Sequence, residues 1–264
     1  MNTLKALLWD VDGTIADTER DGHRIAFNQA FAEAGLDWDW GIALYGQLLT
    51  VSGGKERLRY FIEEWKPGFE EPEDLDSFIR ELHRVKTRCY LALLEQGAIP
   101  LRPGVERLLE EARATGLRLA IVTTTTPENV TALLGSTLGP DSIGWFDLIA
   151  AGDIVPGKKP APDIYHYALE HLDLQAIECL ALEDSDNGLL SSAGAGIKTL
   201  VTVNDYTRQQ DFSGAAIVVD QLGEPGAGFE VVAGDAGGAT FVDVAFLMRI
   251  FSRQSGNLMH NKPR

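Results

Sequence analysis

The chain has 264 residues, of which 45% are hydrophobic and 23% are charged. These are the proportions of a globular protein with one or two domains, and they exclude long disorder, collagen and coiled coil. The formal net charge of −16 argues against a nucleic-acid duplex or an anionic membrane as a partner, because both carry negative charge. Any anionic substrate must therefore meet a locally basic pocket.

The two cysteines, Cys89 and Cys179, fit no metal-ligand spacing and suit a reducing compartment. No run of apolar residues is long enough to span a membrane. An apolar segment begins at Leu4, with no signal peptide ahead of it. We therefore expect a cytoplasmic protein, with the chloroplast stroma, after removal of a transit peptide, as the alternative.

The first predicted element is a buried strand that begins at Leu4 and ends in the polar sequence DVDGT. Residues 17–98 then show apolar residues at helical spacing and no strand-like alternation. The clearest helical patterns cover residues 25–34, 58–64 and 78–94. We predict an all-helical insert over residues 17–98, within a core formed by residues 1–16 and 99–264.

Strands and helices alternate after this insert. Helices are predicted over residues 105–114, 128–134, 163–172, 188–196 and 242–251, and strands over residues 117–123, 146–153, 179–184 and 198–203. This order is typical of an α/β fold with a doubly wound parallel sheet. Such sheets bind ligands at the carboxyl ends of their strands.

Two carboxylates, Asp10 and Asp12, follow the first strand. Carboxylates this close together cannot both stay anionic without a cation nearby. A carboxylate pair with a divalent metal suits phosphoryl transfer, in which one carboxylate attacks phosphorus and the other moves protons.

Three later strand ends or loops carry further polar groups. Thr123 ends the second strand, where its hydroxyl and the N–H groups that open a helix can hold an anion. Lys159 lies in a loop that two prolines stiffen. Glu183 and Asp184 end another strand and offer the oxygen ligands that Mg²⁺ prefers.

Each of these groups has a plainer interpretation when it is taken alone. Asp10 and Asp12 could belong to an ordinary turn after a strand. Thr123 could be a helix N-cap, and Lys159 could be a solvated surface charge. Glu183 and Asp184 could be acids that a helix dipole favours. Their order along one alternating pattern of strands and helices favours a common site instead.

With these motifs the chain resembles the haloacid dehalogenase superfamily, in its β-phosphoglucomutase-like branch. The resemblance implies a Rossmann-like core, with a doubly wound parallel sheet, and an all-helical cap domain inserted after the first strand. It also implies that Asp10 is the nucleophile that becomes an aspartyl-phosphate. Asp12 is then the general acid and base, and its backbone carbonyl binds Mg²⁺.

The remaining motifs receive roles from the same resemblance. Thr123, with Thr124 beside it, would hold the transferring phosphoryl group, and Lys159 would steady the charge of nucleophile and phosphate. Asp184 would be the principal acidic ligand of Mg²⁺ at its strand end, with Glu183 beside it, and Asp10 would complete the metal site.

A closer resemblance, to the CbbY family, lies in the strings GLDWDW, LYGQLLTVSGGKERLRYF and LGEPGAGFE. That family is associated with Calvin-cycle carbon fixation. The resemblance implies removal of the 1-phosphate from xylulose-1,5-bisphosphate, an inhibitor of Rubisco, which gives xylulose 5-phosphate and phosphate. The expected partner is this small sugar bisphosphate, with a functional link to Rubisco but no established contact, and a monomer is expected.

The second phosphate of such a substrate needs cations of its own in the cap. Gly53 and Gly54 lack side chains and could let the backbone approach a ligand. The substrate-binding candidates in the cap are Glu19, His23, Gly53, Gly54, Lys55, Arg57, His83 and Lys86. Each could instead be a solvated surface residue. Trp38 and Trp40 could line a sugar site or pack in the cap core.

Four other functions compete with this one. A sugar phosphomutase, or a phosphatase for a different sugar phosphate, could use the same aspartyl-phosphate. A haloacid dehalogenase needs no Mg²⁺, so the acidic pair Glu183–Asp184 argues against it. A non-catalytic scaffold is disfavoured because every motif residue is present.

Overall fold

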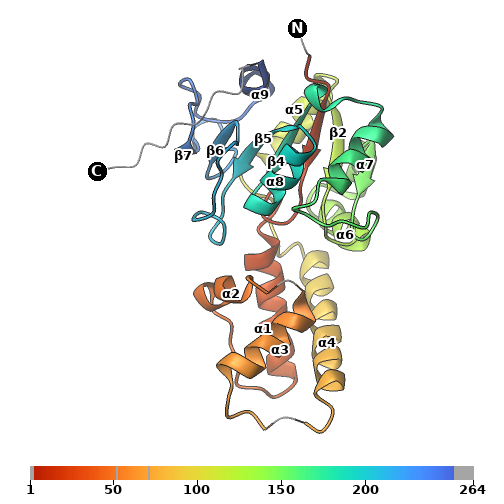
Figure 1. Ribbon diagram of the computed structural model, residues 1–264, viewed down its shortest axis with the longest axis vertical. Coiled ribbons are helices and arrows are strands. Elements are labelled where there is room, and N and C mark those ends of the chain that lie inside the picture. Colours follow the sequence, from red (N-terminus) through yellow and green to blue (C-terminus); the bar gives the residue numbers. More distant parts are fainter. Residues whose placement is uncertain (1–2, 52, 71, 253–264) are drawn as a thin grey trace, which may run out of the picture. The chain divides into compact units, whose positions relative to one another are not determined.

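The chain divides into two units, one of which is inserted into the sequence of the other. The first comprises Met1–Asp17 together with Pro100–Arg264, and the second comprises Thr18–Ile99 (Figure 1). The computed structural model describes residues 3–51, 53–70 and 72–252.

The first unit is built on a sheet with the strand order β3-β2-β1-β4-β5-β6-β7. The strands are β1 (Ala6–Trp9), β2 (Arg118–Val122), β3 (Leu148–Ala150), β4 (Cys179–Glu183), β5 (Lys198–Thr202), β6 (Ile217–Val219) and β7 (Val231–Ala233). Neighbouring strands from β3 to β6 run parallel, which confirms the predicted doubly wound α/β fold. A parallel sheet was predicted, but the edge strand β7 is antiparallel to β6.

Helices lie on both sides of this sheet (Figure 1). They are α5 (Val105–Ala114), α6 (Pro127–Thr137), α7 (Asp163–Leu172), α8 (Asp186–Gly194) and α9 (Val244–Ser252), with 3₁₀ turns η2 (Pro140–Trp145) and η3 (Ala176–Glu178). Helix α7 buries Ile164 and Tyr165 in one cluster with Leu8 and Val122 of the sheet. Because the central strands are covered on both faces, every residue of β1 is buried.

The described residues of the second unit form helices joined by turns and loops, with no strand among them. It contains a π-helical turn, η1 (Thr18–His23), and the helices α1 (Arg24–Glu33), α2 (Ile42–Leu48), α3 (Gly54–Trp65) and α4 (Leu75–Glu95). Helix α2 was not predicted; its sequence, IALYGQL, is only seven residues long. Gly41, its N-cap residue, separates it from the GLDWDW segment.

An aromatic cluster forms the core of this helical unit. The Trp40 ring centroid lies 4.6 Å from that of Phe27 and 5.0 Å from that of Phe31, and Trp38 stands edge-on to Phe31 and Phe61. Trp38 and Trp40 are both buried. They therefore serve as packing residues of the core, which is the second of their two interpretations.

Two observations concern membranes and thiols. None of the helices described combines the length and the apolar character that crossing a bilayer requires. Cys89 is half-buried, Cys179 is buried, and both are free thiols.

Candidate active site at the carboxyl ends of β1 and β4

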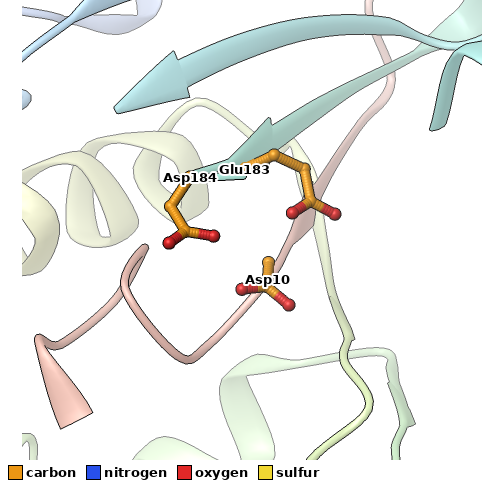
Figure 2. A group of neighbouring side chains, drawn as sticks. All are labelled: Asp10, Glu183 and Asp184. Atoms are coloured by element: carbon orange, nitrogen blue, oxygen red, sulfur yellow. The ribbon is translucent and has the colours of Figure 1, made fainter. Parts of the chain in front are cut away.

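The register of the central strands places Asp10 beside Glu183. Trp9 of β1 pairs with Leu182 of β4, and the Asp10 N–H donates to the Leu182 carbonyl over 3.0 Å. Asp10, Glu183 and Asp184 each direct a carboxylate oxygen to one place, within 4.8 Å of one another (Figure 2). Two adjacent strands thus bring together carboxylates that are far apart in the sequence.

A tight turn follows Asp10 and carries Asp12. The Gly13 N–H donates to the Ala16 carbonyl over 2.7 Å. Gly13 has a φ of +83°, and a Cβ there would collide with the side chains of Asp184 and Asn204. Only glycine combines this backbone angle with such a close approach. The turn can therefore lie directly against the acidic end of β4.

Lys159 joins the two acidic strand ends. Its Nζ lies 2.7 Å from Asp10 Oδ1, 2.7 Å from Glu183 Oε1 and 2.9 Å from the Val122 carbonyl oxygen. The side chain is only 8% exposed. Burial opposes the charged ammonium, but attraction to Asp10 and Glu183 outweighs it and raises the pKa of Lys159. Lys159 is therefore a buried cation bound to the acids, and its interpretation as a solvated charge is wrong.

Burial makes the ionised forms of both acids at the end of β4 unfavourable. Burial, and after it the charge of Asp10, raises the pKa of Asp184 well above its ordinary value. Burial likewise raises the pKa of Glu183, although Lys159 opposes the shift. Each acid accepts one side-chain hydrogen bond besides those of Lys159: the Tyr165 hydroxyl donates to Glu183 Oε1, and Asn204 Nδ2 donates to Asp184 Oδ2 over 2.7 Å.

These groups fit a divalent metal ion. Lys159 supplies one positive charge against three buried carboxylates, and Glu183 Oε2 is buried without a hydrogen-bond partner among the described residues. Carboxylate oxygens are the ligands of hard cations such as Mg²⁺. The Asp12 carboxylate is not a member of this group of three; the resemblance assigns its backbone carbonyl to the metal.

Thr123 directly follows β2 at the same edge of the sheet. Its N–H donates to the Ala150 carbonyl over 3.0 Å, and its hydroxyl accepts the Thr125 N–H over 3.3 Å. Thr123 is buried and Thr124 is exposed. The N-cap of α6 is Thr126, whose side chain accepts the Asn129 N–H, so Thr123 is not the helix cap that its plainer interpretation suggested.

Several expected cap residues come together in the helical unit. His23 stacks on Tyr90, with ring centroids 4.0 Å apart, and its Nδ1 lies 2.8 Å from Lys86 Nζ. Burial, Lys86 and Arg57 lower the pKa of His23. Burial and the neighbouring cations Lys86, Lys55 and Arg57 lower the pKa of His83 to about 4. The cluster therefore consists of cations and neutral imidazoles.

Arg57 and Glu19 are connected through a tyrosine that the sequence analysis did not single out. Arg57 Nη1 donates to the Tyr45 hydroxyl over 2.9 Å, and this hydroxyl donates to Glu19 Oε2 over 2.5 Å. Arg57 Nε also donates to the Leu48 carbonyl over 3.2 Å. The guanidinium is thus buried and fixed in place by the protein itself.

The two glycines before Arg57 do not leave open space for a ligand. A Cβ at Gly54 would meet the His83 ring, and one at Gly53 would meet the Glu56 carboxylate. Lys55 is exposed and lines a groove of about 530 Å³ together with residues of α3 and α4 that include Arg59 and Arg80.

Three residues of the site region escaped sequence reasoning: Tyr165, Asn204 and Arg102. Asn204 lies just past β5, so a polar side chain after an apolar strand could have indicated it. Tyr165 lies in α7, where an aromatic residue at helical spacing indicates core packing. Arg102 is buried and bonds almost entirely to backbone carbonyls, which leave no mark in the sequence.

The fold and this acidic strand-end site define a class of hydrolase with a doubly wound α/β core and an inserted helical unit. The sequence model of the haloacid dehalogenase-like hydrolases matches residues 4–196. The chain therefore belongs to the haloacid dehalogenase-like hydrolase family, which confirms the predicted resemblance.

Within that family the chain is similar to CbbY proteins. It is 48% identical over 222 residues to the plasmid-encoded protein CbbY of Cupriavidus necator, a match that covers 84% of this chain and 87% of the relative. The crystal structure of CbbY from Rhodobacter sphaeroides in complex with phosphate is 45% identical, with a TM-score of 0.72 over 83% of this chain and 95% of that one. A mutant of the same protein, in complex with xylulose-(1,5)bisphosphate, has a TM-score of 0.71 over the same shares, at 45% identity.

Proposed function

We propose that this chain is a Mg²⁺-dependent phosphatase that converts xylulose-1,5-bisphosphate to xylulose 5-phosphate and phosphate. The observation that carries the proposal is the group of Asp10, Glu183 and Asp184, the first two of which bind the Lys159 ammonium. The substrate is suggested by the similar CbbY of Rhodobacter sphaeroides, a mutant of which was crystallised with xylulose-(1,5)bisphosphate.

In this proposal Asp10 is the nucleophile. Lys159 donates to Asp10 Oδ1 over 2.7 Å and the Thr14 hydroxyl donates to Oδ2 over 3.5 Å, so the carboxylate is held in place. One of its oxygens attacks phosphorus and forms the aspartyl-phosphate. The P–O bond to the sugar breaks as the new bond forms, and Asp12 gives its proton to the leaving sugar oxygen. Asp12 then takes a proton from the water that hydrolyses the aspartyl-phosphate, which releases phosphate and restores Asp10.

The surrounding residues bind and orient the transferring group. Thr123 and Thr124 lie at the end of β2, where a hydroxyl and backbone N–H groups can donate to phosphoryl oxygens. Lys159 offsets negative charge on both the nucleophile and the phosphoryl group. Mg²⁺, held by Asp10, Glu183, Asp184 and the Asp12 carbonyl, would supply Lewis-acid neutralisation of the phosphoryl oxygens.

The helical unit would bind the second phosphate. Lys86 and Arg57 are close enough to His23 and His83 to lower the pKa of both rings, so positive charge is concentrated there. An anion would relieve this repulsion, and Glu19 would accept hydrogen bonds from sugar hydroxyls. Such an enzyme would be linked to Rubisco through the removal of its inhibitor, which needs no contact between the two proteins. We propose that the enzyme is monomeric and cytoplasmic.

The test is phosphate release from xylulose-1,5-bisphosphate, ribulose-1,5-bisphosphate, fructose-1,6-bisphosphate and glucose phosphates, with Mg²⁺ and with EDTA. We expect selective, Mg²⁺-dependent hydrolysis of xylulose-1,5-bisphosphate. Asp10→Asn serves as the blank, and its turnover should fall by at least ~10³-fold while its circular dichroism stays native. Wild-type turnover in that variant would contradict the assignment of the nucleophile.

Two other outcomes would redirect the proposal. Conversion of glucose 1-phosphate to glucose 6-phosphate with little free phosphate would identify a phosphomutase. Equal turnover of all the bisphosphates would retain the phosphatase and remove the selective substrate.

A further inference from the structure

We propose that Arg102 is a positioning residue that fixes the turn carrying Asp12 against the segment that orients Asp184. This inference rests on the proposed Mg²⁺-dependent phosphatase, because it concerns the alignment of the same acidic groups. Arg102 lies just before α5, in the unit that contains the sheet, and it is 8% exposed.

The Arg102 guanidinium binds carbonyl oxygens from three separate segments. Nη1 donates to the Gly13 carbonyl and, over 3.0 Å, to the Thr202 carbonyl. Nη2 donates to the Val203 and Asp220 carbonyls, each over 2.6 Å. Nε faces the Asp17 carboxylate at 3.5 Å, which offsets the buried positive charge.

Two of these segments carry groups of the acidic site. Gly13 follows Asp12 directly, so the hydrogen bond to its carbonyl fixes the peptide that adjoins the proposed acid and base. Val203 precedes Asn204, whose amide donates to Asp184 Oδ2. Arg102 therefore holds the turn after β1 and the segment after β5 at a set separation.

The packing between these segments leaves little room for error. The space beside Gly13 Cα is taken by the side chains of Asp184 and Asn204. If the turn moved by a fraction of an ångström, Asp12 and Asp184 would shift relative to each other. Residues that orient metal ligands from behind change affinity or activity by about 10–100-fold when they are replaced.

A planar guanidinium suits this task better than an ammonium. Its donors diverge in one plane and reach the three segments at once, whereas a lysine presents a single point of charge. Arg102→Lys should keep the buried charge and lose the simultaneous contacts. Arg102→Gln should lose both.

Arg107 provides a matched control in the same unit. It also donates to backbone carbonyls, those of Gly223 and Val242, and it pairs with Glu224 over 2.8 Å. None of these partners belongs to the acidic site. Arg107→Gln should therefore lower the melting temperature without changing catalysis or metal binding.

The experiment measures kcat and KM for phosphate release, Mg²⁺ affinity by calorimetry without substrate, and the melting temperature of each variant. For Arg102→Lys we expect kcat to fall and the Mg²⁺ dissociation constant to rise, each by about 10–100-fold, with a smaller change in KM. Arg107→Gln should retain the wild-type kcat, KM and Mg²⁺ dissociation constant, and only its melting temperature should fall.

Wild-type kcat and Mg²⁺ affinity in Arg102→Lys would overturn the inference and leave Arg102 as a stability residue only. If Arg102→Gln does not fold, Arg102→Lys still decides the question. If the wild-type chain hydrolyses none of the sugar phosphates, the proposed function fails. The calorimetric comparison of wild type and Arg102→Lys then still tests the positioning role.

Discussion

Lys159 Nζ lies 2.7 Å from Asp10 Oδ1, although 149 positions separate the two residues in the chain. The same ammonium lies 2.7 Å from Glu183 Oε1, so one cation bridges the acids at the ends of two neighbouring strands. A buried charge that loses its partner is far more costly than a surface ion pair that is broken. The arrangement therefore links the stability of the sheet's edge to the groups proposed for catalysis.

Lys159→Met should destabilise the metal-free protein by ~3–5 kcal/mol at pH 8, because Asp10 and Glu183 remain buried without the ammonium. The loss should shrink at pH 5.5, since burial raises the pKa of Glu183 to about 7 and protonation removes its uncompensated charge. Urea denaturation at both pH values measures the effect. Lys158→Met is the control: Lys158 is exposed and pairs with Asp153, so its loss should cost under ~1 kcal/mol. Similar losses in the two variants would contradict the prediction.

Asp184→Asn should stabilise the metal-free protein at pH 8 while it weakens Mg²⁺ binding. Burial raises the pKa of Asp184, so the ionised carboxylate carries a cost that the amide removes. We expect a gain of ~1 kcal/mol, or ~2–4 °C in melting temperature. The nearby Asp186 lies in the first turn of α8, where a negative charge is favoured. Asp186→Asn should therefore change stability in the opposite direction, and a loss in both variants would disprove the argument.

The stabilisation by Mg²⁺ should grow with pH. Because the folded-state pKa values of Glu183 and Asp184 are raised, the metal-free fold gains stability from their protonation at low pH and loses it as pH rises. Mg²⁺ requires the ionised carboxylates. The Mg²⁺-induced rise in melting temperature should therefore be larger at pH 8 than at pH 5.5. An equal or smaller rise at pH 8 would count against a metal site at these acids.

His83 should make the fold sensitive to mild acid. Its pKa is lowered from 6.5 to about 4, so its contribution to stability is present above pH 6.5 and is lost as pH falls toward 4. His83→Gln should flatten the decline in unfolding free energy between pH 7 and 4.5, measured in urea. The exposed His166 supplies the control, and His166→Gln should follow the wild-type curve. A wild-type decline in His83→Gln would refute the assignment.

The convergence of Asp10, Glu183 and Lys159 could be predicted because it depends on one rule. The carboxyl ends of parallel strands meet at one edge, so the acids at the ends of β1 and β4 are expected at the same edge of the sheet. The adjacency of β1 and β4 is given by the structure alone. The pairing of Trp9 with Leu182 then places Asp10 beside Glu183. The strands β6 and β7, of three residues each, were not predicted.

The helical unit was less predictable for a different reason. Its motif glycines suggested an approach for a ligand, yet the His83 ring occupies the space beside Gly54. Arg57 was expected as a cation for the second phosphate or as a solvated surface residue, whereas it is buried and held by Tyr45 and the Leu48 carbonyl. Such contacts depend on how helices pack against each other, which spacing along the chain does not determine.

The chain leaves the sheet-bearing unit and returns to it at neighbouring points, since Ala16 forms an antiparallel bridge with Leu101 and the Arg102 N–H donates to the Ile15 carbonyl. An inserted unit whose two ends are adjacent can be accommodated without rearranging the fold that carries it. Residues 18–99 can diverge, lengthen or be exchanged between relatives without a change in the path of any strand of the sheet. If the helical unit binds the second phosphate as proposed, substitutions within one continuous stretch of the gene can change substrate specificity and leave the catalytic residues of the sheet-bearing unit unchanged.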